Sequence, residues 1–308
     1  MFYIKKRNQY FNERNEKLKD SKKIELLNGI YMPPVYKDVK YYYKPKDSYA
    51  TGVDSLGRIQ HKYTKEHTLR RNISKKKTLI DVNKKIKRIK KKIDDDLLKN
   101  KYPKERNIAL ILKLMNQCHF RIGNKQYEEK YGSIGLTTLQ KKHIKINKNK
   151  IYIEFLGKKG VENKCLLEDK QLASILKKLY HTNDSYLFSY LNDNHESRNI
   201  SVNDVNQYLD EFDITNKDLR MWNANYLFLK FLHQELKKNT SFINTKTNKK
   251  KLMKLAVEKT ALYMHNTPTV CKSSYICKDM YNQLLDKNNL LQELQKPKVN
   301  IMDLIKNH

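Results

Sequence analysis

Four polar residues stand alone in apolar or tightly turned parts of the sequence, where they could act on a substrate. Arg121 ends an apolar run, and Arg220 stands among apolar residues. Lys158 lies at the tip of a predicted hairpin, and Tyr275 follows a helix-breaking Asn-Thr-Pro segment. Because the chain has only 10 arginines against 54 lysines, an arginine in an apolar setting suggests use of its planar, bidentate donor fork. Taken singly, each residue also has an ordinary explanation, such as an ion pair, a solvated lysine or a core tyrosine.

Several common reaction classes lack their sequence signatures. The chain has no G-x-x-x-x-G-K-[ST] phosphate loop, so ATP-driven chemistry is not expected. The run Asp94-Asp95-Asp96 is interpreted as a charge-balancing turn, and no His pair has metal-ligand spacing with a third ligand in reach. We therefore expect no cofactor and no metal. The cysteines have no C-x-x-C spacing and are expected to be reduced thiols: Cys118, Cys165, Cys271 and Cys277.

The charge balance indicates a polyanionic partner. The 308 residues include 64 Lys and Arg against 33 Asp and Glu, a net charge of +31. Positive charges in such excess repel one another unless an anionic partner neutralises them. Codon bias in an AT-rich genome can account for part of the excess of lysine. The hydrophobic content of 39% and the 21 tyrosines argue against global disorder. Without a signal peptide or an apolar run near the roughly 18–20 residues of a membrane span, we expect a soluble intracellular protein.

Residues 1–75 are predicted to form a small, mostly β domain. Gly52 and Gly57 bracket an Asp-Ser pair, which is turn chemistry between two strands, and the second strand continues through residues 59–63. An amphipathic helix follows, with apolar residues at intervals of three and four from Leu79 to Leu97. The stretch from Arg70 to Lys92 carries 12 basic residues and one acid, so this helix is a candidate for phosphate contact.

Residues 76–308 are predicted to form a larger, mainly helical domain, which makes the fold class α+β. Period-two alternation predicts strands near 144–146 and 151–155, with a third strand near 161–166, and hence a three-stranded β-meander. A helix carrying Ile108 to Met115 precedes it. Further helices are expected at about 168–180, 201–212, 216–237, 251–264 and from about 275, with a loop over 238–250.

Four motifs, taken in their order along the chain, resemble those of type IB DNA topoisomerases, most closely the small poxvirus-like and bacterial enzymes. They are Phe120-Arg121-Ile122-Gly123, Phe155-Leu156-Gly157-Lys158, Lys217-Asp218-Leu219-Arg220, and Asn266-Thr267-Pro268 followed by Tyr275. The turn over residues 52–58 also matches the N-terminal DNA-clamping domain of that family. The resemblance extends from about residue 50 to about residue 280, and it implies the tyrosine recombinase/topoisomerase IB catalytic fold in residues 76–308.

The resemblance implies a role for each isolated residue. Tyr275 is the expected nucleophile, which leaves a 3′-phosphotyrosyl bond and a free 5′-hydroxyl. Arg121 and Arg220 are expected to donate to the nonbridging phosphate oxygens, where charge develops in the transition state. Lys158 is the expected general acid for the 5′-oxygen, with Arg121 assisting. Because the phosphotyrosyl bond retains the energy of the phosphodiester, rejoining the strand needs no ATP. Before the strand is rejoined, the free end can swivel and release supercoils.

One catalytic position departs from the poxvirus pattern, in which a His stands nine residues before the tyrosine. Here that position is Asn266, and His265 lies one residue earlier. Bacterial members carry Asn-Thr-Pro at this point, so the phosphate contact is assigned to Asn266, whose amide can donate the same hydrogen bond without a positive charge. His265 is kept as the second choice.

The resemblance also implies DNA contacts in the N-terminal domain. Gln60, His61 and Tyr63 align with family residues that enter the major groove, where bases are distinguished by their donors and acceptors. Because His61 replaces an aromatic residue of the poxvirus enzymes, the preferred cleavage sequence stays open. The remaining candidate DNA-binding residues are basic: Arg58, Lys62, Arg70, Arg71 and Lys125.

Two alternatives remain open. A tyrosine recombinase shares the catalytic fold and the Arg-Lys-Arg-Tyr set, but it typically has a His where this sequence has Lys217. A non-enzymatic DNA-binding protein would suit the charge but would not need an intact catalytic set. The expected partner is double-stranded DNA, clamped by a monomer and joined covalently through Tyr275. The expected location is intracellular and DNA-associated. Composition and small size suggest a viral origin, which adds a virion or a cytoplasmic viral factory as alternatives.

Overall fold

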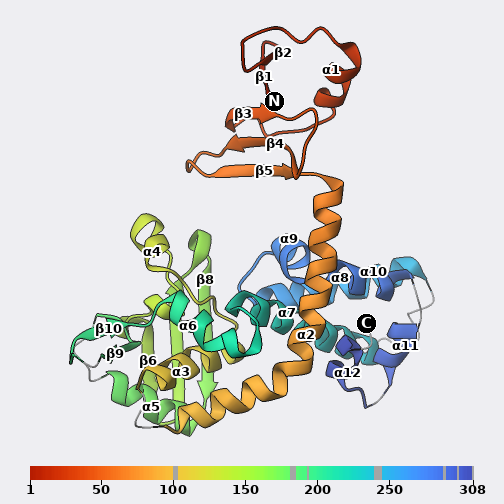
Figure 1. Ribbon diagram of the computed structural model, residues 1–308. Coiled ribbons are helices and arrows are strands. Elements are labelled where there is room, and N and C mark those ends of the chain that lie inside the picture. The colour runs from red at the N-terminus through yellow and green to blue at the C-terminus, as the bar shows by residue number, and fades with distance from the viewer. Residues whose placement is uncertain are drawn as a thin grey trace. The chain divides into compact units, whose positions relative to one another are not determined.

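The computed structural model describes residues 1–99, 103–180, 185–192, 194–238, 245–286, 289–296 and 298–306. They divide into two compact units, Met1–Lys75 and Lys76–His308 (Figure 1). Each unit has its own hydrophobic core. The first unit is built mainly on a β-sheet and the second mainly on helices, which confirms the predicted α+β class.

The first unit is a five-stranded antiparallel sheet with one short helix, α1 (Ser21–Asn28). The tyrosine-rich composition is explained in part by its core, in which Tyr3, Tyr10 and Tyr41 are buried beside Leu27 and Ala50. The predicted hairpin is confirmed as β4 and β5, whereas the other strands were not predicted. In spatial order the strands are β2 (Gln9–Asn12), β1 (Tyr3–Lys6), β3 (Lys37–Tyr41), β4 (Ser48–Val53) and β5 (Ile59–Tyr63).

The second unit contains the predicted meander as β6 (Ile144–Asn147), β7 (Lys150–Leu156) and β8 (Glu162–Glu168). Alternate residues such as Ile151 and Ile153 on β7 are buried, which is the physical basis of the period-two signal. Around this sheet lie α3 (Pro103–Cys118), α4 (Lys125–Tyr131), α5 (Lys170–Tyr180), the short helices η1 (Leu136–Thr138), η2 (Lys141–His143) and η3 (Lys158–Gly160), and a small hairpin of β9 (Ser189–Leu191) and β10 (Ser197–Asn199).

Helix α7 (Asn216–Lys238) is central to the helical part, because it is buried on nearly all sides. It packs against α8 (Lys246–Tyr263), α11 (Asn289–Gln295), α12 (Ile301–Lys306) and the π-helical turn η5 (Cys271–Tyr275). Helix α2 (Lys65–Leu97) begins in the first unit and continues in the second. The remaining elements are α6 (Val202–Leu209), η4 (Asp210–Phe212), α9 (Pro268–Val270) and α10 (Lys278–Asp286).

Two local predictions are wrong. The expected turn at Asp94-Asp95-Asp96 lies inside α2, because Ile93 and Leu97 continue the buried apolar stripe on either side of it. Asp96 is buried and pairs with Lys92 and Lys99. The expected loop over 238–250 is wrong at its ends, since residue 238 belongs to α7 and residues 246–250 to α8; residues 239–244 lie outside the described residues.

The cysteines also differ from expectation. Cys118, at the end of α3, forms a disulfide with Cys165 on β8, with the two Cα atoms 5.6 Å apart. Cys271 and Cys277 are free and buried, as predicted for thiols. Two cysteines 47 residues apart form no recognisable disulfide motif in the sequence. Cys118 and Cys165 are brought together by the packing of α3 against β8.

Candidate active site

Arg121 lies in a loop that directly follows α3 and is held by main-chain contacts. The backbone N–H of Leu136 donates to the carbonyl oxygen of Arg121 at 3.0 Å. Gly123 has a positive φ of 91°, and a Cβ at this position would lie only 2.8 Å from the Cα of Gly135. The glycine two residues after Arg121 is therefore required by this backbone approach, which fixes where the arginine leaves the main chain.

Arg220 projects from α7 and is only 4% exposed. Its Nη1 donates to the carbonyl oxygen of His119, and its Nη2 donates to that of Met264 at 2.6 Å. Burial lowers the pKa of Arg220 to about 10, so the guanidinium stays protonated at neutral pH. Two carbonyl groups thus fix the orientation of a charged side chain inside the core.

Tyr275 ends η5, which follows directly on α9. The Nε of Arg220 donates to its phenolic oxygen at 3.4 Å, and the guanidinium carbon lies 5.4 Å from the ring centroid. Burial raises the pKa of Tyr275, but the charges and hydrogen bonds of Arg220 and Arg121 together more than offset this, so the pKa is lowered overall. The backbone of the tyrosine is fixed by Asn225 on α7, whose Nδ2 donates to the Tyr275 carbonyl oxygen at 2.9 Å.

Asn266 and His265 lie side by side in the chain but point to different partners. The Oδ1 of Asn266 accepts a hydrogen bond from the Nη2 of Arg121. Its Nδ2 is buried and has no hydrogen-bond partner among the described residues. The Nε2 of His265 instead lies 3.0 Å from the carbonyl oxygen of Cys118, and its ring centroid is 5.0 Å from that of Phe120. Asn266 thus keeps an amide donor without a partner among the described residues, whereas the imidazole of His265 is engaged with the protein.

Lys158 begins η3, the turn between β7 and β8, and its side chain is exposed. Its Nζ lies 5.9 Å from the ring centroid of Tyr127 on α4. The glycine that precedes it is required by packing, because a Cβ on Gly157 would lie 2.4 Å from the Nδ2 of Asn163. The packing of Gly157 therefore fixes the backbone of the hairpin tip, from which the exposed side chain of Lys158 projects.

One cavity of about 350 Å³ brings four of the predicted residues together, namely Arg121, Lys158, Arg220 and Tyr275. Asn266 does not line the cavity itself but is bonded to Arg121. Sequence reasoning assigned no role to several other residues of this cavity, although Lys217 stands inside one of the recognised motifs. The further polar lining residues are Asn124, Tyr127, Ser133, Asn216 and Lys217.

The predicted DNA contacts of the first unit lie on or next to β5, which is an edge strand. Asp54 accepts hydrogen bonds from Arg58 at 2.8 Å and from the Nε2 of Gln60 at 2.9 Å, so both side chains share one anchor. The hydrogen bond from Arg58 is the main cause of a lowered pKa of Asp54. Further along the strand the side chains are exposed: His61, Lys62 and Tyr63.

Several of the basic residues predicted to contact DNA lie beside acidic residues, which partly neutralise them. Arg70 pairs with Asp47, and Lys125 lies 3.8 Å from Glu129. Arg71 lies over the ring of Tyr63, at 5.4 Å. Along α2, the positive field is therefore weaker than the residue count suggests, because several lysines form ion pairs with carboxylates: Lys76, Lys84, Lys85, Lys91 and Lys92.

Two kinds of feature are absent from the part of the chain that the structure describes. No group of three or more His, Cys, Asp or Glu side chains there could hold a metal ion. In the same part of the chain, no helix combines the length and the apolar character that crossing a membrane requires.

Comparison with known proteins places the chain in a family. Residues 61–300 match the family model for the catalytic core of eukaryotic DNA topoisomerase I. The DNA topoisomerase 1B of Acanthamoeba polyphaga mimivirus is 31% identical over 288 residues, which cover 91% of this chain and 84% of that protein. The DNA topoisomerase 1B of vaccinia virus (strain Copenhagen) is 28% identical over 277 residues, which cover 88% and 85%. The chain therefore belongs to the topoisomerase I family that includes the viral type IB DNA topoisomerases.

Proposed function

We propose that this type IB topoisomerase relaxes duplex DNA by cutting and rejoining one strand through a covalent bond to Tyr275. The observation that carries the proposal is the single cavity lined by Arg121, Lys158, Arg220 and Tyr275. Two guanidinium groups, an ammonium group and a phenol are the groups that attack on a phosphodiester requires, and here they come from four separate parts of the chain.

In the first step the phenolic oxygen of Tyr275 attacks the scissile phosphorus. The new oxygen–phosphorus bond forms as the bond to the 5′-oxygen breaks, and the phenolic proton passes to solvent. The charges of Arg220 and Arg121, which lower the pKa of Tyr275, favour loss of this proton. They also stabilise the negative charge that develops on the nonbridging oxygens. The buried Nδ2 of Asn266 supplies a further neutral donor to the same oxygens.

The leaving 5′-oxygen requires a proton, since an alkoxide is a poor leaving group. Lys158 is the proposed general acid, because its exposed ammonium group stands at the end of a hairpin that borders the cavity. The products are a 3′-phosphotyrosyl bond and a free 5′-hydroxyl. Reversal of the same step rejoins the strand without ATP, after the free end has rotated and released supercoils.

Duplex DNA is the proposed partner, and the net charge of +31 supplies the attraction. All the proposed catalytic residues belong to one unit, so a single chain suffices for the chemistry. The residues on and near β5 are proposed to contact DNA in the major groove, with phosphate contacts from Arg58, Lys62, Arg70, Arg71 and Lys125. We extend the proposal to a DNA-associated location inside an infected cell, in keeping with viral relatives.

The test is to incubate the purified chain with supercoiled plasmid in the absence of ATP and Mg²⁺. The expected result is a ladder of relaxed topoisomers, together with DNA joined to protein when the reaction is stopped with detergent. Mass spectrometry of the trapped complex should place the DNA on Tyr275. Strand exchange between two sites without general relaxation would overturn the proposal in favour of a recombinase, and binding without any nicking would overturn it in favour of a DNA-binding protein.

A further inference from the structure

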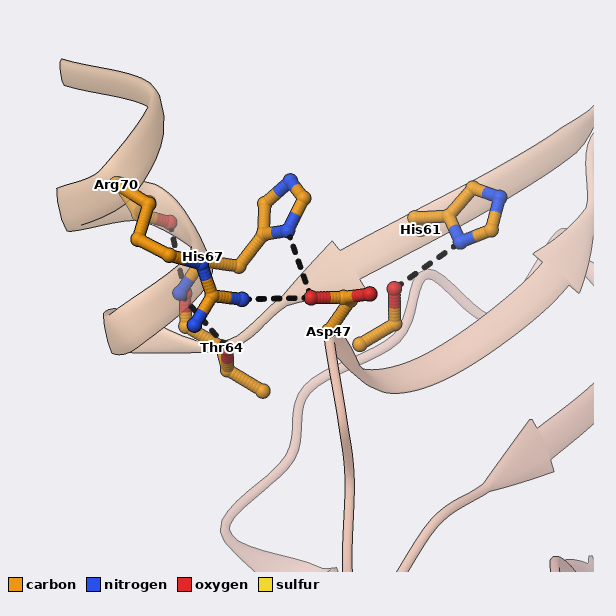
Figure 2. Close-up of polar contacts among 7 residues, drawn as sticks. Asp47, His61, Thr64, His67 and Arg70 are labelled. Carbon is orange, nitrogen blue, oxygen red and sulfur yellow. Dashed lines mark hydrogen bonds and ion pairs between the residues drawn. The ribbon is translucent and has the colours of Figure 1, made fainter. Parts of the chain in front are cut away.

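The first unit contains a second set of polar contacts, centred on Asp47, that the proposed chemistry does not use (Figure 2). The Oδ1 of Asp47 accepts a hydrogen bond from the Nη2 of Arg70 at 2.7 Å and lies 3.2 Å from the Nδ1 of His67. The next residue, Ser48, begins β4, and its Oγ lies 3.1 Å from the Nδ1 of His61. The consecutive residues Asp47 and Ser48 thus each contact the Nδ1 atom of a histidine.

The two imidazoles belong to a stack of rings. The ring of Tyr63 is nearly parallel to that of His61, with 9° between the planes and centroids 5.4 Å apart. It is equally parallel to His67, with 8° between the planes and centroids 4.4 Å apart. The guanidinium of Arg71 lies 5.4 Å from the same tyrosine ring. The edge strand β5 and the first turns of α2 together carry a surface patch of parallel aromatic and imidazole rings.

This surface is built on a well-anchored backbone. Thr64, between β5 and α2, is buried, and its N–H donates to the carbonyl oxygen of Asp47 at 2.9 Å. Its Oγ1 accepts a hydrogen bond from the N–H of His67 at 3.0 Å, which is an N-terminal cap of α2. The main chain at residues 47 and 64 is thus fixed independently of the Asp47 carboxylate. The Asp47 side chain is therefore not needed to hold the backbone and can orient the imidazole of His67.

The hydrogen bond to Asp47 fixes which nitrogen of His67 carries a proton. The hydrogen bond from His67 lowers the pKa of Asp47, so the group is a carboxylate at neutral pH and can only accept. The Nδ1 of His67 must therefore be the donor, and in the neutral ring the Nε2 is an acceptor. An acceptor in the major groove pairs with the amino group of cytosine or adenine.

A purely structural role for Asp47 is the weaker explanation. The side chains of Asp47 and Arg70 are 45% and 62% exposed. An ion pair at that exposure contributes little to stability, typically ~0–1 kcal/mol. The same carboxylate nevertheless contacts two side chains of α2, the guanidinium of Arg70 and the imidazole of His67, which is 24% exposed.

We propose that Asp47 is a positioning residue for DNA sequence preference, which orients His67 within the ring stack of His61, Tyr63 and His67 so that its Nε2 reads a base edge in the major groove. The proposal rests on the proposed DNA-binding function and adds a determinant of which sequences are preferred.

The experiment measures binding preference in a way that does not depend on cleavage. Full-length protein carrying Tyr275→Phe is used to select duplexes from a pool with randomised positions, and bound sequences are counted. The same background receives Asp47→Ala, Asp47→Asn, His67→Ala, or Asp47→Ala and His67→Ala together. The matched control is Glu25→Ala, which removes one exposed negative charge from α1 of the same unit. Thermal melting of each variant checks that the unit is folded.

We expect Asp47→Ala to reduce the preference at one base-pair position about tenfold, within the range of a single base contact. His67→Ala should reduce it at the same position, and the double variant should lose no more than either single change, because the two residues act as one unit. Asp47→Asn, whose amide oxygen still accepts from Nδ1, should retain the preference within about twofold. Glu25→Ala should leave the preference unchanged.

Three outcomes would overturn the proposal: a Tyr275→Phe protein with no sequence preference, an Asp47→Ala variant with the same preference as Glu25→Ala, or an Asp47→Asn variant that loses as much as Asp47→Ala. Should melting show that Asp47→Ala is unfolded, the comparison of Asp47→Asn with His67→Ala decides in its place. Failure of the proposed function is seen separately, as absence of plasmid relaxation by the unmodified chain.

Discussion

The Nε of Arg220 donates a hydrogen bond to the phenolic oxygen of Tyr275 across 55 residues of sequence. The Arg220 side chain is held by two carbonyl groups inside the core. The backbone of Tyr275 is held by the side chain of Asn225, which donates to the Tyr275 carbonyl oxygen. The contact therefore joins two fixed groups. A phosphate placed at the tyrosine oxygen would lie beside the guanidinium charge of Arg220 without any movement of that side chain. Such preorganisation is the condition for strong electrostatic stabilisation.

This contact predicts a pH dependence. Burial raises the pKa of Tyr275, while Arg220 and Arg121 lower it further than burial raises it, so the phenolate forms below its ordinary pKa of about 10. We expect the single-turnover cleavage rate to rise with pH and to level off below that value. Arg220→Ala should shift the rising limb upward and slow cleavage by about 10²–10³-fold. An unchanged profile in Arg220→Ala would contradict the role given to this arginine.

The nucleophile can be tested by removing one oxygen atom. Tyr275→Phe should abolish nicking and relaxation and leave salt-dependent DNA binding nearly unchanged, because the net charge stays the same. Tyr281→Phe is the matched control; its ring packs on Phe228 in the same region. Gel assays of relaxation and filter binding measure the two properties. Relaxation by Tyr275→Phe would show that another residue is the nucleophile.

The role of Lys158 can be tested through the leaving group. Lys158→Ala should slow cleavage of ordinary DNA by about 10²–10⁴-fold, the usual contribution of a general acid. A substrate with sulfur in place of the 5′-oxygen needs no proton to depart, so the variant should cleave it at nearly the unmodified rate. Lys159→Ala, on the same turn, is the control and should be normal with both substrates. Equal slowing on the sulfur substrate would count against proton donation by Lys158.

The choice between Asn266 and His265 is open to a direct comparison. Asn266→Ala should slow cleavage by about a hundredfold, because its buried Nδ2 is the proposed donor to phosphate. Asn266→Asp should be slower still, since a carboxylate repels the phosphate. His265→Ala removes a contact to the carbonyl oxygen of Cys118 and should mainly lower the melting temperature. The reverse pattern in cleavage rates would make His265 the phosphate contact.

The disulfide between Cys118 and Cys165 predicts a redox-dependent stability. The bond closes a loop of 47 residues in the unfolded chain. A loop of that length corresponds to about 4 kcal/mol of stabilisation by chain entropy. We expect Cys165→Ser, or treatment with dithiothreitol, to lower the free energy of unfolding in urea by up to this amount. Dithiothreitol should have no effect on Cys165→Ser, and identical curves for the oxidised and reduced protein would contradict the prediction.

The sequence by itself determined the elements whose signals are local. Alternating burial along β7, the glycine turn between β4 and β5 and the apolar stripe of α2 all depend on residues close in the chain. The four motifs likewise carried the family resemblance, which the comparisons confirm. Local signals were less reliable at element ends, as at residues 246–250, which begin α8.

Only the tertiary structure decided which of these residues share a site and which charges are already paired. The contact of Arg121 with Asn266 spans 145 residues, and that of Asp47 with Arg70 spans 23. The Cys118–Cys165 bond and the ion pairs of the α2 lysines have the same origin. Such contacts depend on how distant elements pack, and periodicity within one element carries no information about the partner that packing brings against it.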